Sequence, residues 1–157
     1  MPIRLGTRDD VVETCRLDQA LYGEDAWTYE RICRVFDSGA LQLVVATVSD
    51  LVVGHANAVS VSPAAFYRLL LGAVPSTALE DSDVAPSSGY WWIGSVSVES
   101  EHQKKGLGRE LFQTINERVE GEVIADVWSP GGSALVAGEP RWLLAHSGPY
   151  PVWRRRA

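Results

Sequence analysis

The most constraining feature of this chain is the stretch from Val96 to Leu111, which runs VSVESEHQKKGLGREL. Its first residues alternate between apolar and polar side chains, which is the period of a β-strand. From residue 107 the apolar side chains instead follow helical spacing, at Leu107, Leu111, Phe112, Ile115 and Val119. The stretch therefore predicts a strand, a short glycine-containing loop and the first turns of an amphipathic helix.

The start of that helix is suited to bind an anion. The first backbone N–H groups of a helix have no partners within it and carry partial positive charge. Gly106 and Gly108 have no Cβ, so a phosphate can come close to the backbone there. Lys104 and Lys105, the only two lysines of the chain, lie in the same loop. On spacing alone both phosphate binding and plain turn chemistry remain open, because a short glycine motif is weak evidence by itself.

The wider pattern carries a resemblance to a known family. Val98-x₄-Gln103-x₂-Gly106-x-Gly108-x₂-Leu111 resembles the acetyl-CoA-binding signature of the GNAT superfamily of N-acetyltransferases, in which a strand precedes Arg/Gln-x-x-Gly-x-Gly/Ala and a helix. Ser100 departs from the pattern, since many members have Pro there. The segment GEDAWT at 23–28, a helix after it and ALQLVVA at 40–46 are similar to the ribosomal-protein N-acetyltransferase branch of that superfamily.

Length and charge narrow the classes of protein. The 157 residues predict one domain over 1–157, and the net charge of −6, from 14 basic and 20 acidic residues, disfavours a generic nucleic-acid binder. The chain has neither a long apolar run nor a signal-peptide core, so we expect a cytoplasmic protein without a membrane partner. We expect Cys15 and Cys33 to be buried thiols, and the scattered histidines predict no metal site.

The resemblance implies an α/β (α+β) fold of GNAT type, a mixed central sheet flanked by helices, in which the fourth and fifth strands run parallel. Hydrophobic periodicity predicts its strands over 3–5, 41–47, 51–61, 90–98 and 122–128, the second and third forming a hairpin. Helices are expected after Thr7 and Thr28, and from 107 to about 120. The intervening segment 62–89 predicts a helix or hydrophobic lid followed by a flexible loop, and it is either a wall of the acceptor site or a surface insertion.

The C-terminal part fits the family pattern less well. After the fifth strand the family has a helix with an Asn near its start and a Tyr near its end. Here Gly132 stands where the Asn is expected, and the segment 141–148 would be the end of the helix, with Leu144 near the Tyr position. Little chain then remains for the family's final strand, and the arginines at 154–156 are expected to form a solvated tail.

The resemblance also implies how acetyl-CoA is held. Backbone amides of the loop would cradle the pyrophosphate, cationic side chains would add charge, and the strand backbone would pair with the pantetheine arm. A strand amide, that of Val98, would polarise the thioester carbonyl. The residues assigned to acetyl-CoA are Val96, Ser97, Val98, Gln103, Lys104, Lys105, Gly106, Leu107, Gly108 and Arg109.

The proton-transfer groups are less well defined by the sequence. An alkyl ammonium must lose a proton before it attacks, and many family members place a Glu on or near the central strand, yet residues 84–98 contain no carboxylate. Asp126, His55 and Glu99 are the candidates for the base. Each also has a structural interpretation, as a hydrogen-bonded strand residue, a sheet-face histidine and a solvated charge. Tyr150 is the candidate to reprotonate the CoA thiolate.

Two functional hypotheses follow. The first is an acetyl-CoA-dependent N-acetyltransferase, in which an amine attacks the thioester directly. Its acceptor would be a small amine, a protein N-terminus or a lysine, and a homodimer is left open. The second is a catalytically degenerate relative, which binds acyl-CoA or nothing and acts as a regulatory or interaction module. The missing strand carboxylate favours the second, whereas the intact loop favours the first.

Overall fold

The computed structural model describes residues 2–156, whose strands form one mixed sheet in the order β1-β2-β3-β4-β5-β7-β6. The strands are β1 (Ile3–Leu5), β2 (Leu41–Val48), β3 (Leu51–Ser60), β4 (Tyr90–Val98), β5 (Glu122–Asp126), β6 (Trp142–His146) and β7 (Val152–Arg155). The helices are α1 (Val11–Tyr22), α2 (Tyr29–Asp37), α3 (Pro63–Leu70), α4 (Leu107–Arg118) and α5 (Pro130–Ala137). The predicted β2–β3 hairpin and the parallel pairing of β4 with β5 are confirmed.

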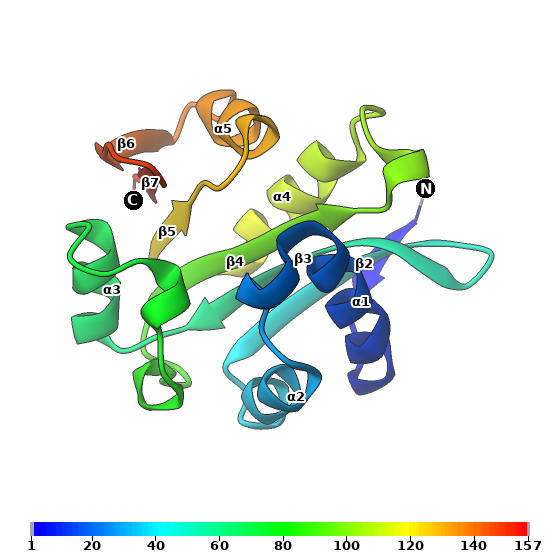
Figure 1. The fold of residues 1–157 in the computed structure, drawn as a ribbon, viewed down its shortest axis with the longest axis horizontal. Helices are drawn as coiled ribbons and strands as arrows, with labels where there is room; N and C mark the ends of the chain where they lie inside the picture. The colour runs from blue at the N-terminus through cyan, green and yellow to red at the C-terminus, as the bar shows by residue number, and fades with distance from the viewer. Residues whose placement is uncertain (1, 157) are drawn as a thin grey trace.

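Helices cover the two faces of the sheet and define two hydrophobic layers (Figure 1). On one face α1, α2 and α3 pack against a core that includes Phe66, Trp92 and Ile124. On the other face α4 packs through Leu111, Phe112 and Ile115 against residues that include Ile93 and Val123. Neighbouring residues of β4 and β5 thus serve opposite layers, as alternation along a strand requires.

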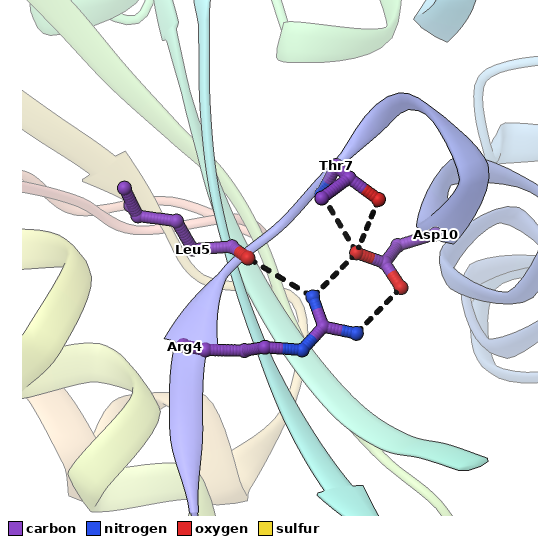
Figure 2. A network of polar contacts seen from close by, with 4 residues as sticks. All are labelled: Arg4, Leu5, Thr7 and Asp10. Atoms are coloured by element: carbon purple, nitrogen blue, oxygen red, sulfur yellow. Dashed lines mark hydrogen bonds and ion pairs between the residues drawn. The ribbon is translucent and has the colours of Figure 1, made fainter. Parts of the chain in front are cut away.

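A short ion-paired turn fixes the start of α1 against β1 (Figure 2). The guanidinium of Arg4 donates to both carboxylate oxygens of Asp10, at 2.7 and 2.9 Å. The Asp10 carboxylate also accepts from the backbone N–H and the hydroxyl of Thr7, the N-cap residue, as the carboxylate of a capping box does. The Arg4 bonds hold the pKa of Asp10 below its usual range. The entry of α1, and hence the residues it carries toward the sheet, is fixed by this turn.

Strand β4 pairs with β5 only along its first half. The parallel register runs from Tyr90–Glu122 to Ile93–Ala125, and beyond Ile93 the β4 strand continues beside β3 alone. The register with β3 shifts at this point, and a Cβ on Gly94 would lie 2.6 Å from the amide oxygen of Asn57. A side chain at Gly94 would therefore have to displace the Asn57 side chain of β3. The divergence of β4 from β5 opens the sheet at its centre.

The segment between β3 and β4 is held in place rather than loose. After α3 it forms two short 3₁₀ turns, Ser76–Ala78 and Asp81–Asp83. Arg31 of α2 donates to the carbonyl of Leu79 at 2.5 Å and pairs with Asp81 at 3.2 Å. Leu79 itself is buried in the α1–α3 layer. The predictions of a helix at the start of this segment and of a loop after it are confirmed, and Arg31 of α2 binds that loop.

The C-terminal predictions are wrong in three respects. The stretch 141–148 does not end a helix, because Leu144 lies on strand β6 and α5 already ends at Ala137. A final strand, β7, does form and inserts between β5 and β6. The arginine run is not a solvated tail, since Arg155 is buried and donates to the carbonyls of Asn116 and Val119 at the end of α4. Burial lowers the pKa of Arg155.

Both cysteines are free thiols and buried, as expected. Cys15 lies on α1 and Cys33 on α2, and both pack in the layer on that face of the sheet. Burial raises the pKa of the Cys15 thiol to about 11, so this side chain behaves as a small hydrophobic group.

Candidate active site

A cavity of about 820 Å³ occupies the opening between β4 and β5. Its two ends differ in chemistry, and we name them by their charge. The basic end is lined by Val96, Val98, Gln103, Lys104, Gly106, Gly108, Arg109, Phe112 and Leu135. The acidic end is lined by Asp18, Tyr22, Trp27, Asn57, Ser76, Trp92, Asp126 and Trp128. One cavity thus joins a site suited to an anion with a site suited to a cation.

The basic end is built around the first turn of α4. Gly106 is the N-cap residue and has a φ of +86°, a left-handed conformation that favours glycine. Among the described residues no side chain caps this helix start, so the amides of its first turn are available to a ligand. Gly108 has less reason to be glycine within the protein, because a Cβ there would meet only Leu135 and Val98, each at 3.9 Å. The open space beside Gly108 belongs to the cavity.

The backbone of β4 supplies a further donor. Glu99 donates its N–H to Val53 of β3 at 2.8 Å. Because successive N–H groups of a strand point to opposite sides, the N–H of Val98 points away from β3, toward the opening. Gln103 donates to the carbonyl of Val98 at 2.8 Å, which fixes the loop against the strand end. Gln103 therefore positions the loop, and the Val98 amide is the donor that faces the cavity.

The acidic end centres on the carboxylate of Asp126, the last residue of β5. Its Oδ1 accepts from the indole N–H of Trp92 at 2.7 Å, and its Oδ2 accepts from the indole N–H of Trp128 at 2.7 Å. The hydroxyl of Ser76, from the segment between β3 and β4, also donates to Oδ2. An ionised carboxylate has about four acceptor positions, so these three bonds fix its orientation and leave one position for a ligand.

A second carboxylate at this end, that of Asp18, is occupied by hydrogen bonds within the protein. Asp18 of α1 is only 9 % exposed and accepts from the hydroxyl of Ser97 at 2.6 Å and that of Ser95 at 3.2 Å. Its Oδ1 lies 2.9 Å from Nε2 of His55. A carboxylate only accepts, so the hydrogen of this contact lies on Nε2. Within residues 2–156 the other ring nitrogen, Nδ1, has no partner. Asp18 thus anchors α1 to β3 and β4.

Tyr22, one turn further along α1, brings a phenol to the cavity. Burial is the main reason that its pKa is raised, and the nearby charge of Asp18 adds to the effect. The phenol therefore stays protonated at neutral pH and can act as a hydrogen-bond donor. The sequence did not point to Tyr22, because the family resemblance places the proton donor for the thiolate near the end of the chain.

The sequence-predicted residues are only partly brought together. Of the four proton-transfer candidates Asp126 lines the cavity, whereas the other three do not. His55 is fully buried beneath Asp18. Glu99 pairs with Arg16 at 3.3 Å, outside the opening. Tyr150 is 44 % exposed and stacks on Trp128 with ring centroids 4.0 Å apart.

The residues predicted to hold acetyl-CoA gather more closely. Seven of the ten line the cavity. The exceptions are Ser97, whose hydroxyl faces Asp18, Leu107, which is buried in the α4 layer, and Lys105, which is exposed. Most of the basic end is thus formed by one contiguous stretch of the chain.

Across residues 2–156 no three His, Cys, Asp or Glu side chains gather closely enough to hold a metal ion. Over the same part of the chain, no helix has the length and apolar character needed to cross a membrane.

Comparison with known proteins gives the family context. Residues 11–131, most of the chain, match the model of the Acetyltransferase (GNAT) family. The match includes the glycine loop and Asp126, but not Leu135 at the basic end. No curated protein matches the chain significantly.

Several solved structures share the fold. GphF, a GNAT-like decarboxylase in complex with isobutyryl-CoA, has a TM-score of 0.72 at 15% identity, covering 99% of each chain. The loading GNATL domain of CurA from Lyngbya majuscula has a TM-score of 0.70 at 14% identity, covering 99% of this chain and 96% of that one. A ribosomal-protein-alanine N-acetyltransferase from Brucella melitensis has a TM-score of 0.63 at 16% identity, covering 100% of both. At these identities the likeness concerns the fold.

Proposed function

Because the chain belongs to the GNAT acetyltransferase family, we propose that it transfers an acetyl group from acetyl-CoA to a primary amine. The observation that carries the proposal is the single cavity in which an uncapped helix start and a fixed carboxylate face one opening. The family uses an acyl-CoA donor, which suits the basic end. The acidic end attracts an ammonium group, so the two substrates are directed to different walls.

The basic end would hold the donor through its backbone. The free amides at the start of α4 bind the pyrophosphate, with Lys104 and Arg109 adding positive charge. Gly108 leaves space for the phosphates beside the helix. The unpaired edge of β4 accepts the pantetheine arm as an added strand. The thioester carbonyl then lies near the N–H of Val98, which stabilises the negative charge that develops on the oxygen during attack.

Asp126 would serve the acceptor. Its carboxylate binds the ammonium and, directly or through one water, takes the proton that the amine must lose. The neutral amine attacks the thioester carbon, and the C–S bond breaks as the new C–N bond forms. The thiolate of CoA leaves, and the Tyr22 phenol, which lines the same cavity, is the donor we assign to it. No acyl-enzyme intermediate is required.

Two other functions suit the geometry less well. Decarboxylation, named for one structural neighbour, requires a site for the carboxylate of the acyl group. At the acidic end the carboxylates of Asp18 and Asp126 would repel that group. A degenerate acyl-CoA-binding module remains the alternative. It is weakened because the carboxylate missing from β4 is replaced, at the cavity, by Asp126 on the neighbouring strand.

The proposal is tested by following free thiol as acetyl-CoA is incubated with a panel of primary amines, after thermal unfolding has been measured with and without acetyl-CoA. A donor that binds only the folded protein raises the midpoint once its concentration exceeds Kd. We expect a higher midpoint and amine-dependent thiol release. A higher midpoint without release from any amine would favour the degenerate module. An unchanged midpoint at millimolar acetyl-CoA would refute the transferase and leave only a degenerate relative that does not bind acyl-CoA.

A further inference from the structure

The acidic end has a composition that the proposed transfer does not by itself require. Three indoles, those of Trp27, Trp92 and Trp128, line the wall around Asp126. Trp27 and Trp92 lie against each other with ring centroids 5.5 Å apart. A carboxylate alone would serve to bind an ammonium, so the aromatic wall points to the rest of the acceptor molecule.

The hydrogen bonds of Asp126 fix how that wall is presented. An indole N–H lies in the plane of its ring, so the planes of Trp92 and Trp128 both run toward the carboxylate that they contact at 2.7 Å. The space in front of the carboxylate is therefore flanked by indole surface. A ligand whose nitrogen reaches the free position on Asp126 must place its adjoining carbon atoms against these rings.

The wall is also held rigidly from behind. The guanidinium of Arg31 lies 3.8 Å from the ring centroid of Trp27, and the same side chain binds Leu79 and Asp81 of the segment that precedes β4. That segment brings Ser76 onto the Asp126 carboxylate. Tyr150 stacks on Trp128. Each part of the wall is thus backed by a second contact, so the shape of the acidic end is present before any ligand binds.

The indoles bonded to Asp126 offer a polypeptide acceptor no free hydrogen-bond donor. The residues that follow a free N-terminus carry peptide N–H and C=O groups, each of which needs a hydrogen-bond partner when it is buried. The N–H groups of Trp92 and Trp128 are already used by Asp126. Asp18 is similarly occupied by its contacts with His55, Ser95 and Ser97. An apolar, flat group meets the wall without such a cost.

We propose that the acceptor is a small primary amine carried on an aromatic ring, an aralkylamine, whose ammonium binds Asp126 and whose ring packs against Trp27, Trp92 and Trp128. Aromatic rings attract both a neighbouring ring and a cation, so both parts of such a molecule are favoured at this site. This inference rests on the proposed function for its chemistry, but the binding site itself can be tested without turnover.

The test compares three amines with saturating acetyl-CoA: phenethylamine, ethylamine, which keeps the ammonium but lacks the ring, and a four-residue peptide with a free N-terminus. Thiol release gives kcat and KM, and quenching of indole fluorescence with CoA present gives the affinity of each amine. We expect kcat/KM and affinity for phenethylamine to exceed those of the other two by about thirty-fold or more. Equal or better values for ethylamine or the peptide would overturn the inference.

A matched pair of variants tests the wall directly. Trp128→Leu removes an indole of the acidic end. Trp91→Leu removes one that donates to the carbonyl of Glu120 at 3.0 Å and packs with the α4 layer, outside the cavity. Trp128→Leu also removes a hydrogen bond to Asp126, which affects both amines alike. We therefore expect it to raise KM and Kd for phenethylamine about ten-fold more than for ethylamine, and Trp91→Leu to change neither. Equal losses for both amines in Trp128→Leu would indicate a structural role only and would contradict the proposal.

The proposed transferase function and the proposed aralkylamine acceptor are contradicted by different results. If no amine releases thiol, the proposed transferase function fails. The aralkylamine site then stands only if phenethylamine still binds the wild type and Trp128→Leu weakens that binding. If thiol is released but the peptide or ethylamine is preferred, the transferase function stands and the inference about the acceptor falls. Absence of both phenethylamine binding and turnover refutes the site.

Discussion

The two ends of the cavity are built by different means. The basic end uses backbone groups of one contiguous stretch, the end of β4, the loop and the first turn of α4, with glycine where the chain needs a positive φ or open space. The acidic end uses side chains from distant segments, of which Ser76 and Asp126 are 50 residues apart and Trp92 and Asp126 are 34 residues apart. Backbone groups of one stretch suit a ligand that is common to a family. Side chains from distant segments suit a ligand that is particular to one protein.

The two ends should also differ in how well they tolerate side-chain substitutions. Backbone groups at the basic end persist through most side-chain changes, so only a change that fills the space or alters the loop should matter. At the acidic end each function belongs to one side chain held by two or three named contacts. Substitutions at the two ends should therefore affect different measurements, and the following predictions test this.

The largest effect is expected for Asp126→Asn. The amide keeps the size of the carboxylate but neither attracts an ammonium nor accepts its proton, so kcat/KM should fall by about 10²–10⁴-fold. The Kd of acetyl-CoA should be unchanged, because the basic end is intact. Steady-state kinetics and calorimetric titration measure the two quantities. Glu117→Gln, on the exposed side of α4, is the control. A large loss in Glu99→Gln instead would mean that the base lies outside this cavity.

Gly108→Leu should, in contrast to Asp126→Asn, weaken the binding of acetyl-CoA. Leucine favours a helix over glycine by up to about 1 kcal/mol, and the protein has room for a Cβ at this position, so the free protein should be no less stable. The side chain would occupy the space beside the helix start, and acetyl-CoA affinity should fall by about 100-fold or more. Thermal unfolding with and without acetyl-CoA shows both effects. Unchanged acetyl-CoA affinity in this variant would remove the basic end as the donor site.

Asp18→Asn tests the part of the acidic end that supports the structure. The carboxylate accepts three hydrogen bonds, and an amide offers one oxygen in place of two, so at least one buried donor among His55, Ser95 and Ser97 loses its partner. A loss of about 1–3 kcal/mol in the free energy of unfolding is expected from chemical denaturation. Asp25→Asn changes an exposed carboxylate of the same cavity and should change the free energy of unfolding by no more than about 0.5 kcal/mol. Similar losses in both would refute the assignment.

The smallest effect is expected for the two lysines. Lys104 lines the cavity and Lys105 does not. Solvated charges contribute little, so Lys104→Ala should weaken acetyl-CoA binding by about 2–5-fold, less at high salt. Lys105→Ala serves as the neighbouring control and should change Kd by less. A larger loss in Lys105→Ala would show that the loop presents its charges differently from the structure.

Much of the fold and the basic end could be predicted because their signals are local. Alternation along β4, helical spacing in α4 and the glycines between them lie within one short stretch, and the hairpin of β2 and β3 joins neighbours in the chain. The C-terminal strands could not be predicted in this way. Strand β7 pairs with β5 on the far side of α5 and β6 in the sequence, and Arg155 binds Asn116 and Val119, 39 and 36 residues earlier, so both are placed by partners distant in sequence. Strand β6, which carries Leu144, then pairs with the outer edge of β7.

One signal for the acidic end was present in the sequence and was missed. Val11, Cys15, Asp18 and Tyr22 recur at helical spacing, so Asp18 interrupts the apolar stripe that α1 turns toward the sheet. A charged residue on a buried stripe requires partners, which predicts a polar network or a site. The partners themselves, His55, Ser95 and Ser97, lie on two other elements, and no local pattern joins them to α1.

The most direct test of the central claim is a calorimetric titration of acetyl-CoA into the wild type, Asp126→Asn and Gly108→Leu. If the cavity has a donor end and a separate acceptor end, the first two proteins bind acetyl-CoA with the same Kd and the third does not bind measurably. A wild type that does not bind would contradict the claim. So would a Kd that changes tenfold on substitution of Asp126, because the two ends would then not act separately.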